Sequence, residues 1–401
     1  MRTLHFSLLP LLAAIVISGP GTARAELRID ADYPGGNILV ESIDGDVVAL
    51  RQDLRDTEGW WFYWSFRAYG AEGKTLTFRF TNRNVLGTRG PAVSLDAGRT
   101  WSWLGAENVE NTSFSYTFLA DVPCVQFAFA PSYQESDLRR FLKQHEANEH
   151  LVVDELCRTR KGRSVERLHV GRVDGNPAHR ILLTCRHHSC ESTASFVLEG
   201  MLAAVLADTD DGKWFRENVE VLAVPLVDKD GVEQGDQGKN RRPRDHNRDY
   251  DGSSLYRSVA ALRSFVPQWS DGRLSVAIDL HCPYIRGNHN EAIYLVGNRD
   301  PKIWNEQCAL SKILESVCRG SLPYKAADNL PFGQSWNTEN NYRAGKSCSR
   351  WAGELKGMRL ATSFEIPYAN VGETTVTPDL ARSFGTRLVE ALRRYLDQPP
   401  P

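Results

Sequence analysis

The sequence predicts an α/β fold in two regions: a small antiparallel β-sandwich domain, followed by a larger domain with a mixed or mostly parallel sheet. The sandwich is predicted over residues 26–135, where segments of alternating apolar residues are separated by glycine, asparagine, aspartate and proline. The α/β domain is predicted over residues 151–398, where strand-like runs alternate with helical patterns. The chain of 401 residues is long enough for two domains.

Strands of the sandwich are expected where apolar and polar residues alternate with a period of two. These segments are residues 60–67, which are rich in aromatic side chains, and residues 76–80, 114–118 and 125–129. Such an aromatic load forms either a binding face for carbohydrate or peptide or, more often, a core. A helix over residues 136–145, which begins at a capping serine, is expected to connect the two regions.

Short apolar runs predict the strands of the second region. They lie at residues 181–184, 219–227, 276–281, 292–296 and 362–366. A helix is expected over residues 192–206, between the first two strands, because its apolar residues recur at helical spacing. In sheets of this kind, functional sites gather in the loops at the carboxyl ends of the strands.

Charge and hydrophobicity exclude some classes of function. The 48 basic residues nearly balance the 50 acidic ones, which argues against a general binder of nucleic acid or membrane surfaces. A hydrophobic content of 41% and a charged content of 24% are ordinary for a soluble globular protein. We expect no membrane span, because no segment reaches the roughly 20 apolar residues that a spanning helix needs.

Residues 1–25 have the pattern of a secretory signal peptide. Arg2 supplies the positive charge, residues 8–17 form a short apolar core, and Ala23-Arg24-Ala25 offers a cleavage site. The alternative is an N-terminal membrane tether, for which the apolar run is short. We therefore expect a secreted or periplasmic protein.

Two histidines and one glutamate fall at the ends of predicted strands. His188 and Glu191 follow one strand, and His281 ends another. Two imidazoles and a carboxylate, with a fourth position left for water, form the ligand set of a hydrolytic zinc site. His187 is an alternative to His188, because a spacing of four residues from Glu191 would suit a helix. Asp279 shares a strand face with His281 and either orients that ligand or caps a backbone group.

Cysteines lie close to these ligands in the sequence. The chain has eight, and export would permit disulfide bonds among them. A pair among Cys185, Cys190 and Cys282 would brace the site, or all three are small buried apolar residues. The sequence leaves both interpretations open, because connectivity cannot be read from it.

Two further segments carry chemistry. The loop at residues 227–250 is polar and glycine-rich, with four arginines between Arg241 and Arg248. Guanidinium groups beside the Asn247 amide would bind a substrate carboxylate, although a solvated charge run has the same composition. Glu365 stands alone in an apolar strand-like run, where a buried and unpaired carboxylate is costly, so we expect a catalytic role for it.

Together these segments resemble the zinc metallocarboxypeptidases of the M14 type, over roughly residues 130–395. His188-Ser-Cys-Glu191 is similar to the His-x-x-Glu motif of that family, and His281 to its third ligand. Residues 245–248 resemble its Asp-x-Asn-Arg segment. A β-sandwich ahead of the catalytic domain resembles the cytosolic carboxypeptidase-like branch. The resemblance implies one Zn²⁺ per catalytic domain, bound by the two histidines and the glutamate.

The same resemblance implies catalytic roles. Glu365 corresponds to the catalytic glutamate of the family, which takes the proton of the water and gives it to the leaving amine. A further arginine of the family polarises the scissile carbonyl. Arg241 is our choice for this arginine, with Arg242 and Arg244 as alternatives because the loop length differs from the common form.

Substrate-binding residues follow in the same way. Asn247 and Arg248 correspond to the pair that binds the terminal carboxylate of the substrate. Tyr342 stands where the family has a mobile tyrosine that covers the substrate, or it is a surface residue. Arg350, with Arg343 and Lys346, would line a specificity pocket that favours acidic C-terminal residues.

The sequence therefore predicts a zinc carboxypeptidase that hydrolyses the C-terminal residue of peptides or proteins. One alternative is a hydrolase of peptidoglycan stem peptides, and another is an amidohydrolase of acylated amino acids. A third is a peptide-binding protein without catalysis, which the apparent completeness of the ligand set disfavours. The expected partner is the C-terminus of a peptide or protein, and no nucleic acid.

Overall fold

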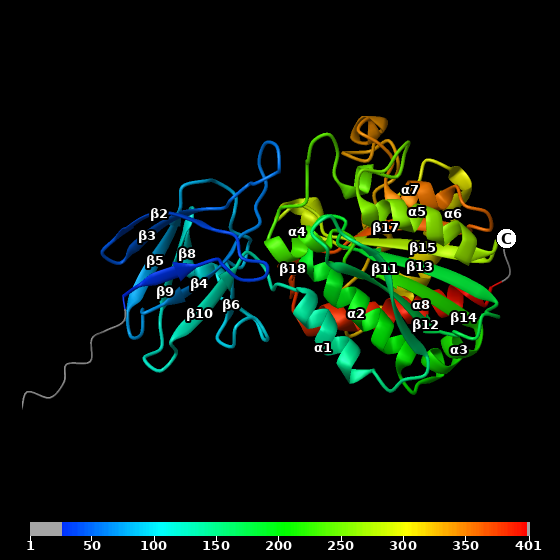
Figure 1. Ribbon diagram of the computed structural model, residues 1–401, viewed down its shortest axis with the longest axis horizontal. Coiled ribbons are helices and arrows are strands. Elements are labelled where there is room, and N and C mark those ends of the chain that lie inside the picture. The colour runs from blue at the N-terminus through cyan, green and yellow to red at the C-terminus, as the bar shows by residue number, and fades with distance from the viewer. Residues whose placement is uncertain (1–25, 399–401) are drawn as a thin grey trace, which may run out of the picture.

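The computed structural model describes residues 26–398 and shows a small all-β body beside a larger α/β body (Figure 1). The predicted signal peptide at residues 1–25 lies outside the described residues. Among the helices of the described part, none is long and apolar enough to cross a membrane. The two-part arrangement with a mixed sheet confirms the predicted fold class.

Two five-stranded sheets form the N-terminal sandwich. In spatial order the first consists of β1 (Arg28–Asp30), β4 (Ser65–Tyr69), β10 (Cys124–Ala128), β6 (Ala92–Ser94) and β7 (Ser102–Trp103). The second consists of β2 (Leu39–Asp44), β3 (Val47–Arg51), β5 (Thr75–Phe80), β9 (Ser113–Thr117) and β8 (Val109–Glu110). All neighbours are antiparallel except β3 and β5, which run parallel. This exception arises because the chain crosses to the first sheet to form β4 before it returns.

The aromatic side chains of the sandwich are its core. Leu76, Phe78 and Phe80 of β5 are buried, whereas the residues between them are at least partly exposed. The ring of Phe78 lies 5.2 Å from the rings of both Phe66 and Phe127. The expected alternation thus buries one face of each strand, and the core interpretation of the aromatic load holds for these residues.

A seven-stranded mixed sheet organises the larger region. Its spatial order is β11 (Leu151–Arg158), β12 (Ser164–Gly171), β14 (Val219–Val224), β13 (His179–Cys185), β15 (Leu274–His281), β17 (Leu360–Glu365) and β16 (Tyr294–Val296). The four strands β14, β13, β15 and β17 are mutually parallel, and the others join antiparallel. The central strands are buried throughout, because helices cover both faces of the sheet. A two-stranded ribbon of β18 (Asn370–Val371) and β19 (Thr374–Thr375) follows.

Helices cover both faces of this sheet (Figure 1). In chain order they are α1 (Glu135–Gln144), α2 (Ser192–Leu206), α3 (Asp210–Asn218), α4 (Lys229–Gln234), α5 (Arg257–Ser270), α6 (Pro301–Val317), α7 (Cys348–Gly353) and α8 (Pro378–Leu396). Helices α5 and α7 pack with one core cluster, and α2, α6 and α8 with the other. Helices α2 and α8 meet through glycines: a Cβ on Gly385 would lie 2.1 Å from Val197 O.

The two regions are joined through the loop that follows α4. The Gln237 side chain accepts from Tyr63 N at 2.7 Å and donates to Tyr63 O at 2.9 Å. Asn37 Nδ2 donates to Gly235 O at 2.7 Å. These buried bonds replace water on both partners, so they fix the loop against the sandwich.

Candidate active site

The candidate metal ligands and Glu365 meet at one edge of the large sheet. Strands β13, β15 and β17 are parallel neighbours, so their carboxyl ends lie side by side. His281 and Glu365 are the last residues of β15 and β17 and are paired in register. His188 and Glu191 lie between β13 and α2.

Arg186 shapes the loop that carries His188 and Glu191, although the sequence analysis does not single it out. Its φ is +61° and its side chain is buried. Nε donates to Ser189 O at 3.0 Å, and Nη1 donates to Tyr133 O at 2.7 Å. A strained backbone of this kind persists where its surroundings hold it, and here these hydrogen bonds hold the turn that directs both side chains to one point.

The three predicted ligands converge. His188 Nδ1 lies 2.8 Å from Glu191 Oε1, and His281 Nδ1 lies 2.7 Å from Glu191 Oε2. Burial alone would raise the pKa of Glu191, but the two imidazoles hold that pKa well below its usual range. All ligand atoms lie within 4.8 Å of one another and are buried. The donor set fits a divalent metal, because a cation would replace the protons that now lie between these atoms.

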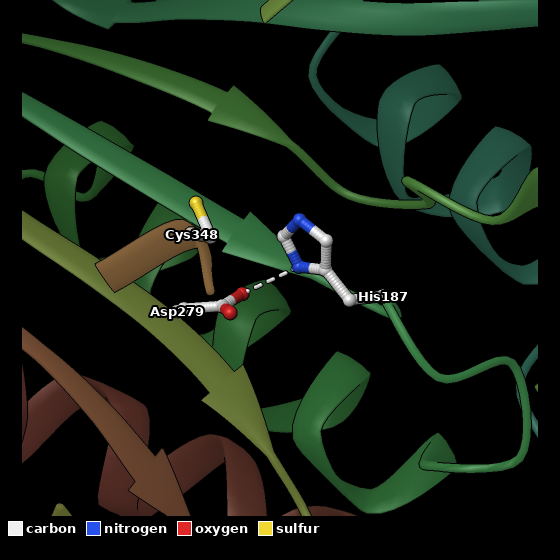
Figure 2. Close-up of side chains that lie close together, drawn as sticks. All are labelled: His187, Asp279 and Cys348. Carbon is white, nitrogen blue, oxygen red and sulfur yellow. Dashed lines mark hydrogen bonds and ion pairs between the residues drawn. The ribbon is translucent and has the colours of Figure 1, made fainter. Parts of the chain in front are cut away.

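Asp279 connects His281 to a second buried cluster, formed by His187, Asp279 and Cys348 (Figure 2). Asp279 Oδ2 lies 2.6 Å from His281 Nε2, and Asp279 Oδ1 lies 2.7 Å from His187 Nδ1. Of the two roles expected for Asp279, the contacts favour orientation of a ligand. The carboxylate holds the His281 ring so that Nδ1 faces Glu191.

The His187 side chain is turned away from the three candidate ligands. Its Nε2 lies 2.7 Å from Tyr250 OH, and the ring is fully buried. Both ring nitrogens therefore have protein partners, so the second cluster supports the site through hydrogen bonds and offers no free imidazole. Of the two adjacent histidines, His188 is the one that meets Glu191.

A cavity of about 230 Å³ opens over these groups. Glu365 lines it together with the three ligands. Its further polar walls include Lys239, Asn247, Arg248 and Ser363, and its apolar walls include Trp61, Tyr284, Tyr294, Val296 and Trp336. A pocket with apolar walls and a few convergent polar groups is the usual form of a site for a small ligand or a chain end.

Glu365 is a buried carboxylate without a close cationic partner. Its Oε2 forms no hydrogen bond to any described residue. Burial raises the pKa of Glu365 to about 7, against the opposing effect of His281, and the nearby charge of Glu191 raises it further. A carboxyl group with such a pKa exchanges protons near neutral pH.

Asn247 and Arg248 also reach the cavity. Asn247 Oδ1 accepts from Cys348 N at 2.9 Å, which anchors the amide. Arg248 donates from Nε to Asn341 O at 2.9 Å and from Nη1 to Asn247 O at 2.8 Å. Among residues 26–398 no hydrogen bond is formed by Arg248 Nη2, which leaves this end of the fork for a ligand.

Tyr342 lines the cavity and is held between two guanidinium groups. The carbon Cζ of Arg248 lies 5.1 Å from the centre of its ring, and that of Arg350 lies 3.4 Å away. Its hydroxyl donates to Asn337 Oδ1 at 3.0 Å. The tyrosine is thus an ordered part of the wall, and it is not an isolated surface residue.

Arg350 itself does not line the cavity, which corrects one prediction. It lies behind Tyr342, where Nη1 is 3.5 Å from Glu339 Oε2. Lys346 pairs with Glu354 at 2.7 Å and, with Arg350, lines a neighbouring hollow. These side chains are directed away from the cavity because acidic groups on the outer surface pair with them.

Arg241 is also placed outside the cavity. Its buried guanidinium contacts Asp228, Asp56 and Asp236, the last at 2.9 Å. A buried guanidinium needs carboxylate partners, and the loop supplies Asp228 and Asp236 while the sandwich supplies Asp56. The choice of Arg241 as the group that polarises the carbonyl therefore does not fit this structure.

The two alternatives to Arg241 fare no better. Arg242 is exposed and pairs with Glu58, and Arg244 Nε lies 2.7 Å from Asp249 Oδ1. The loop instead directs Lys239 into the cavity, and the sandwich contributes Trp61 to the same wall. The sequence indicated these two residues only through composition. Lys239 is one of several basic residues of the loop, and Trp61 belongs to the aromatic segment at residues 60–67.

All eight cysteines lie within the described residues, and all are free. Cys185, Cys190 and Cys282 are separately buried around the ligands, which favours the interpretation as small apolar residues. Cys190 Sγ accepts a hydrogen bond from Trp61 Nε1 at 3.3 Å, so it links the sandwich to the ligand loop.

No family model matches this chain, but curated proteins do. Cytosolic carboxypeptidase 2 of Xenopus tropicalis is 22% identical over 311 residues, which are 73% of this chain and 31% of that protein. Cytosolic carboxypeptidase 6 of Caenorhabditis elegans is 22% identical over 317 residues, which are 70% of this chain and 67% of that protein. The chain thus spans about a third of the first relative and two thirds of the second.

Solved structures give the same fold. A metallo-carboxypeptidase from Burkholderia cenocepacia has a TM-score of 0.76 at 19% identity and covers 93% of this chain and 99% of its own. A metallo-carboxypeptidase from Pseudomonas aeruginosa has a TM-score of 0.71 at 18% identity, with coverage of 92% and 99%. These matches include the sandwich as well as the catalytic region. The chain is thus similar in sequence to cytosolic carboxypeptidases and shares its fold with bacterial metallo-carboxypeptidases.

Proposed function

We propose that the chain is a metallocarboxypeptidase that releases the C-terminal residue of peptides. The observation that carries the proposal is one cavity in which His188, Glu191 and His281 converge beside the buried carboxyl of Glu365. The same cavity presents Asn247 and Arg248, which suit a terminal carboxylate. A metal site, a base and a carboxylate clamp within one pocket are the parts that this reaction requires.

Zinc is the metal that we propose for the site. His188 and His281 would bind it through Nδ1, and Glu191 would bind it through a carboxylate oxygen. When bound, zinc supplies Lewis acidity, which polarises a carbonyl and makes water a better acid at neutral pH. Asp279 supports this role because it fixes the orientation of the His281 ring.

Glu365 is proposed as the group that moves protons. It would accept a proton from the attacking water and later donate it to the nitrogen of the leaving amino acid. A pKa of about 7 suits both steps, because neither protonation state is strongly favoured near neutral pH. Its place at the end of β17, beside His281 at the end of β15, supports this role, because the carboxyl would then lie next to the proposed metal ligands.

Arg248 would bind the terminal carboxylate of the substrate through its free Nη2, and the Asn247 amide lies beside it. Binding of a free chain end restricts the reaction to the last peptide bond, because an internal segment has no carboxylate there. Tyr342 adds an aromatic wall that is fixed by its hydrogen bond to Asn337. The structure gives no support for a preference for substrates with an acidic C-terminal residue, since Arg350 and Lys346 do not line the cavity.

The test is release of free amino acids from peptides that differ only in the C-terminal residue. Wild type would release single residues, and a chelator would abolish the release. Glu365→Gln would retain the metal but lose about 10² to 10⁴ of the rate, as expected for a general acid–base group. Metal content measured by elemental analysis is the control that separates loss of chemistry from loss of the ion.

Other outcomes would decide against this reading. If the metal is bound but no peptide of the panel is cleaved, the same assay with stem peptides and with acylated amino acids decides between the two hydrolase alternatives. If none of these is cleaved, a binding protein without catalysis would be the conclusion.

We also propose that the protein is exported. The proposal rests on the signal-like pattern of residues 1–25, whereas the names of the curated relatives point to the cytosol. Expression of the full chain, followed by cell fractionation and N-terminal mass analysis, tests it. A chain that begins after Ala25 outside the cytoplasm supports export, and an uncleaved cytoplasmic chain refutes it.

A further inference from the structure

Lys239 is a basic side chain in the cavity for which the motifs of the sequence provide no role. It is half-buried, and its Nζ lies 3.4 Å from Nε2 of His188 and 5.7 Å from the centre of the Trp61 ring. The cavity that it lines also contains Glu365 and Arg248. Lys239 and Arg248 are the two lysine or arginine side chains among the described lining residues.

The loop geometry determines this position. Gly238 has a φ of +72°, and a Cβ there would lie 2.2 Å from Ser189 N, so only glycine lets the loop approach the ligand turn this closely. The next residue, Lys239, is held from the other side, because its carbonyl accepts from Thr57 Oγ1 at 2.8 Å. The sandwich and the ligand turn thus clamp the backbone, and the side chain is directed over His188.

Lys239 has no ion-pair partner within 4.0 Å among residues 26–398. Arg241, Arg242 and Arg244 of the same loop all have one. Asp245 faces His188 on this side, with Oδ1 3.7 Å from Nε2 of His188. An ammonium group that lines a cavity without a carboxylate partner is available to a ligand.

The His188 ring would not accept a hydrogen bond from the Lys239 ammonium when a metal is bound. A His188 ring that lends its Nδ1 lone pair to a metal carries its proton on Nε2. Nε2 is then a donor, as the ammonium of Lys239 is, so the two cannot share a hydrogen bond. Asp245 Oδ1, at 3.7 Å, is the carboxylate that faces the Nε2 proton, and the ammonium requires another acceptor.

We propose that Lys239 is a catalytic residue, which donates a hydrogen bond to the carbonyl oxygen of the scissile bond as negative charge develops there. The proposal rests on the proposed function and replaces Arg241 in that role. As water adds to the carbonyl carbon, the π electrons of the C=O bond move to the oxygen, and the ammonium stabilises that oxygen without a change in its own bonds. The same charge would also bind a tetrahedral phosphonate more strongly than a planar product.

The test compares Lys239→Met, Lys239→Arg and a control, Arg242→Met, in the metal-loaded protein. Arg242→Met removes one positive charge from the same loop but from an exposed side chain outside the cavity. Lys239→Met is expected to lower kcat by about 10² to 10³ with KM changed by less than about threefold. Lys239→Arg is expected to recover part of kcat, and Arg242→Met to match wild type. Metal content and melting temperature should be equal in all four proteins.

A second measurement makes the proposal independent of turnover. Calorimetry with a peptide phosphonate that ends in a free carboxylate should show binding weakened by about 10²-fold or more in Lys239→Met, but unchanged in Arg242→Met. If wild type cleaves no peptide yet shows this pattern, the proposed function fails, whereas the contact of Lys239 with an oxyanion in the cavity stands. If Lys239→Met cleaves peptides and binds the phosphonate like wild type, Lys239 has no such role and the proposed function stands.

Discussion

At the scale of single residues, the site separates two buried glutamates by their neighbours. Glu191 lies between two imidazoles, and its pKa is held low. Glu365 lies at the end of β17. Its Oε2 has no hydrogen bond to a described residue, and its pKa is raised to about 7. Two carboxylates of the same type thus have different environments, which suit Glu191 to the proposed role of metal ligand and Glu365 to that of proton carrier.

The raised pKa of Glu365 predicts a stability effect in the metal-free protein. The unfolded chain releases this proton near pH 4.5, whereas the folded protein releases it near pH 7. The contribution of Glu365 to stability therefore falls as the pH rises from 4.5 to 7 and is constant above that range. Glu365→Gln should be more stable than wild type at pH 8 by on the order of 3 kcal/mol, and should match it below pH 4.5.

Urea unfolding of both metal-free proteins at pH 4.5 and pH 8 measures this difference. A gain that is equal at the two pH values would show that amide packing, and not the ionisation of Glu365, is responsible.

Arg241 provides a second prediction at this scale. Its side chain is 6% exposed and is surrounded by three aspartates, so Arg241→Met leaves buried carboxylates without their cation. We expect a loss of about 3 to 5 kcal/mol in the free energy of unfolding. The matched change Arg242→Met, at an exposed pair, should cost less than about 1 kcal/mol. Equal losses from urea unfolding would contradict the assignment of Arg241 to a structural ion cluster.

At the scale of elements, the sequence predicted the strands that are buried on both faces. The runs near residues 181–184, 276–281 and 362–366 became β13, β15 and β17, because continuous apolar residues suit the centre of a sheet. The first two strands of the sheet were missed. In β11 most residues are exposed, so an edge strand such as this lacks the apolar pattern on which the prediction depends.

The contact between α2 and α8 predicts a coupling between packing and the metal site. Gly385→Ala would place a Cβ 2.1 Å from Val197 O, so the two helices must separate. Helix α2 begins directly after Glu191, and a shift of its first turn would move that ligand. We expect a loss of about 1 to 3 kcal/mol in stability together with weaker zinc binding.

Gly353→Ala is the control for this change, since its Cβ would meet the flexible end of Ile303 at 3.1 Å. Melting temperatures and zinc titrations of both variants provide the measurement. A Gly385→Ala protein with wild-type zinc affinity would show that α2 does not transmit the strain to Glu191.

At the scale of the whole molecule, the metal should act as a brace. His188 and Glu191 follow β13, whereas His281 ends β15, so an ion bound by all three would join two strands and a loop. Free zinc at 100 times its dissociation constant should stabilise the fold by about 2.7 kcal/mol. A chelator should therefore lower the melting temperature of wild type, and added zinc should restore it. His281→Asn should show a much smaller shift, and an equal shift in both proteins would argue against this ligand set.

The candidate ligands could be predicted from the sequence, whereas the positions of the basic side chains of the loop could not. His188, Glu191 and His281 fall at strand ends, where spacing and residue type carry the signal. The partners of the loop arginines could not be predicted, because they depend on which acids the folded loop brings near. The position of Lys239 depends on the close approach of Gly238 to the ligand turn, and a distance of that kind leaves no pattern in one sequence.

Trp61 of the sandwich forms part of the cavity wall, so the two regions cannot be exchanged independently between relatives. A catalytic region transplanted without its own N-terminal partner would lose one side of the pocket and the clamp on the loop that carries Lys239. Recombination between relatives should therefore succeed when both halves are exchanged together and fail when the junction falls between them. One hydrophobic cluster runs through both halves, so they should behave as one unit in such exchanges, although each has its own sheet.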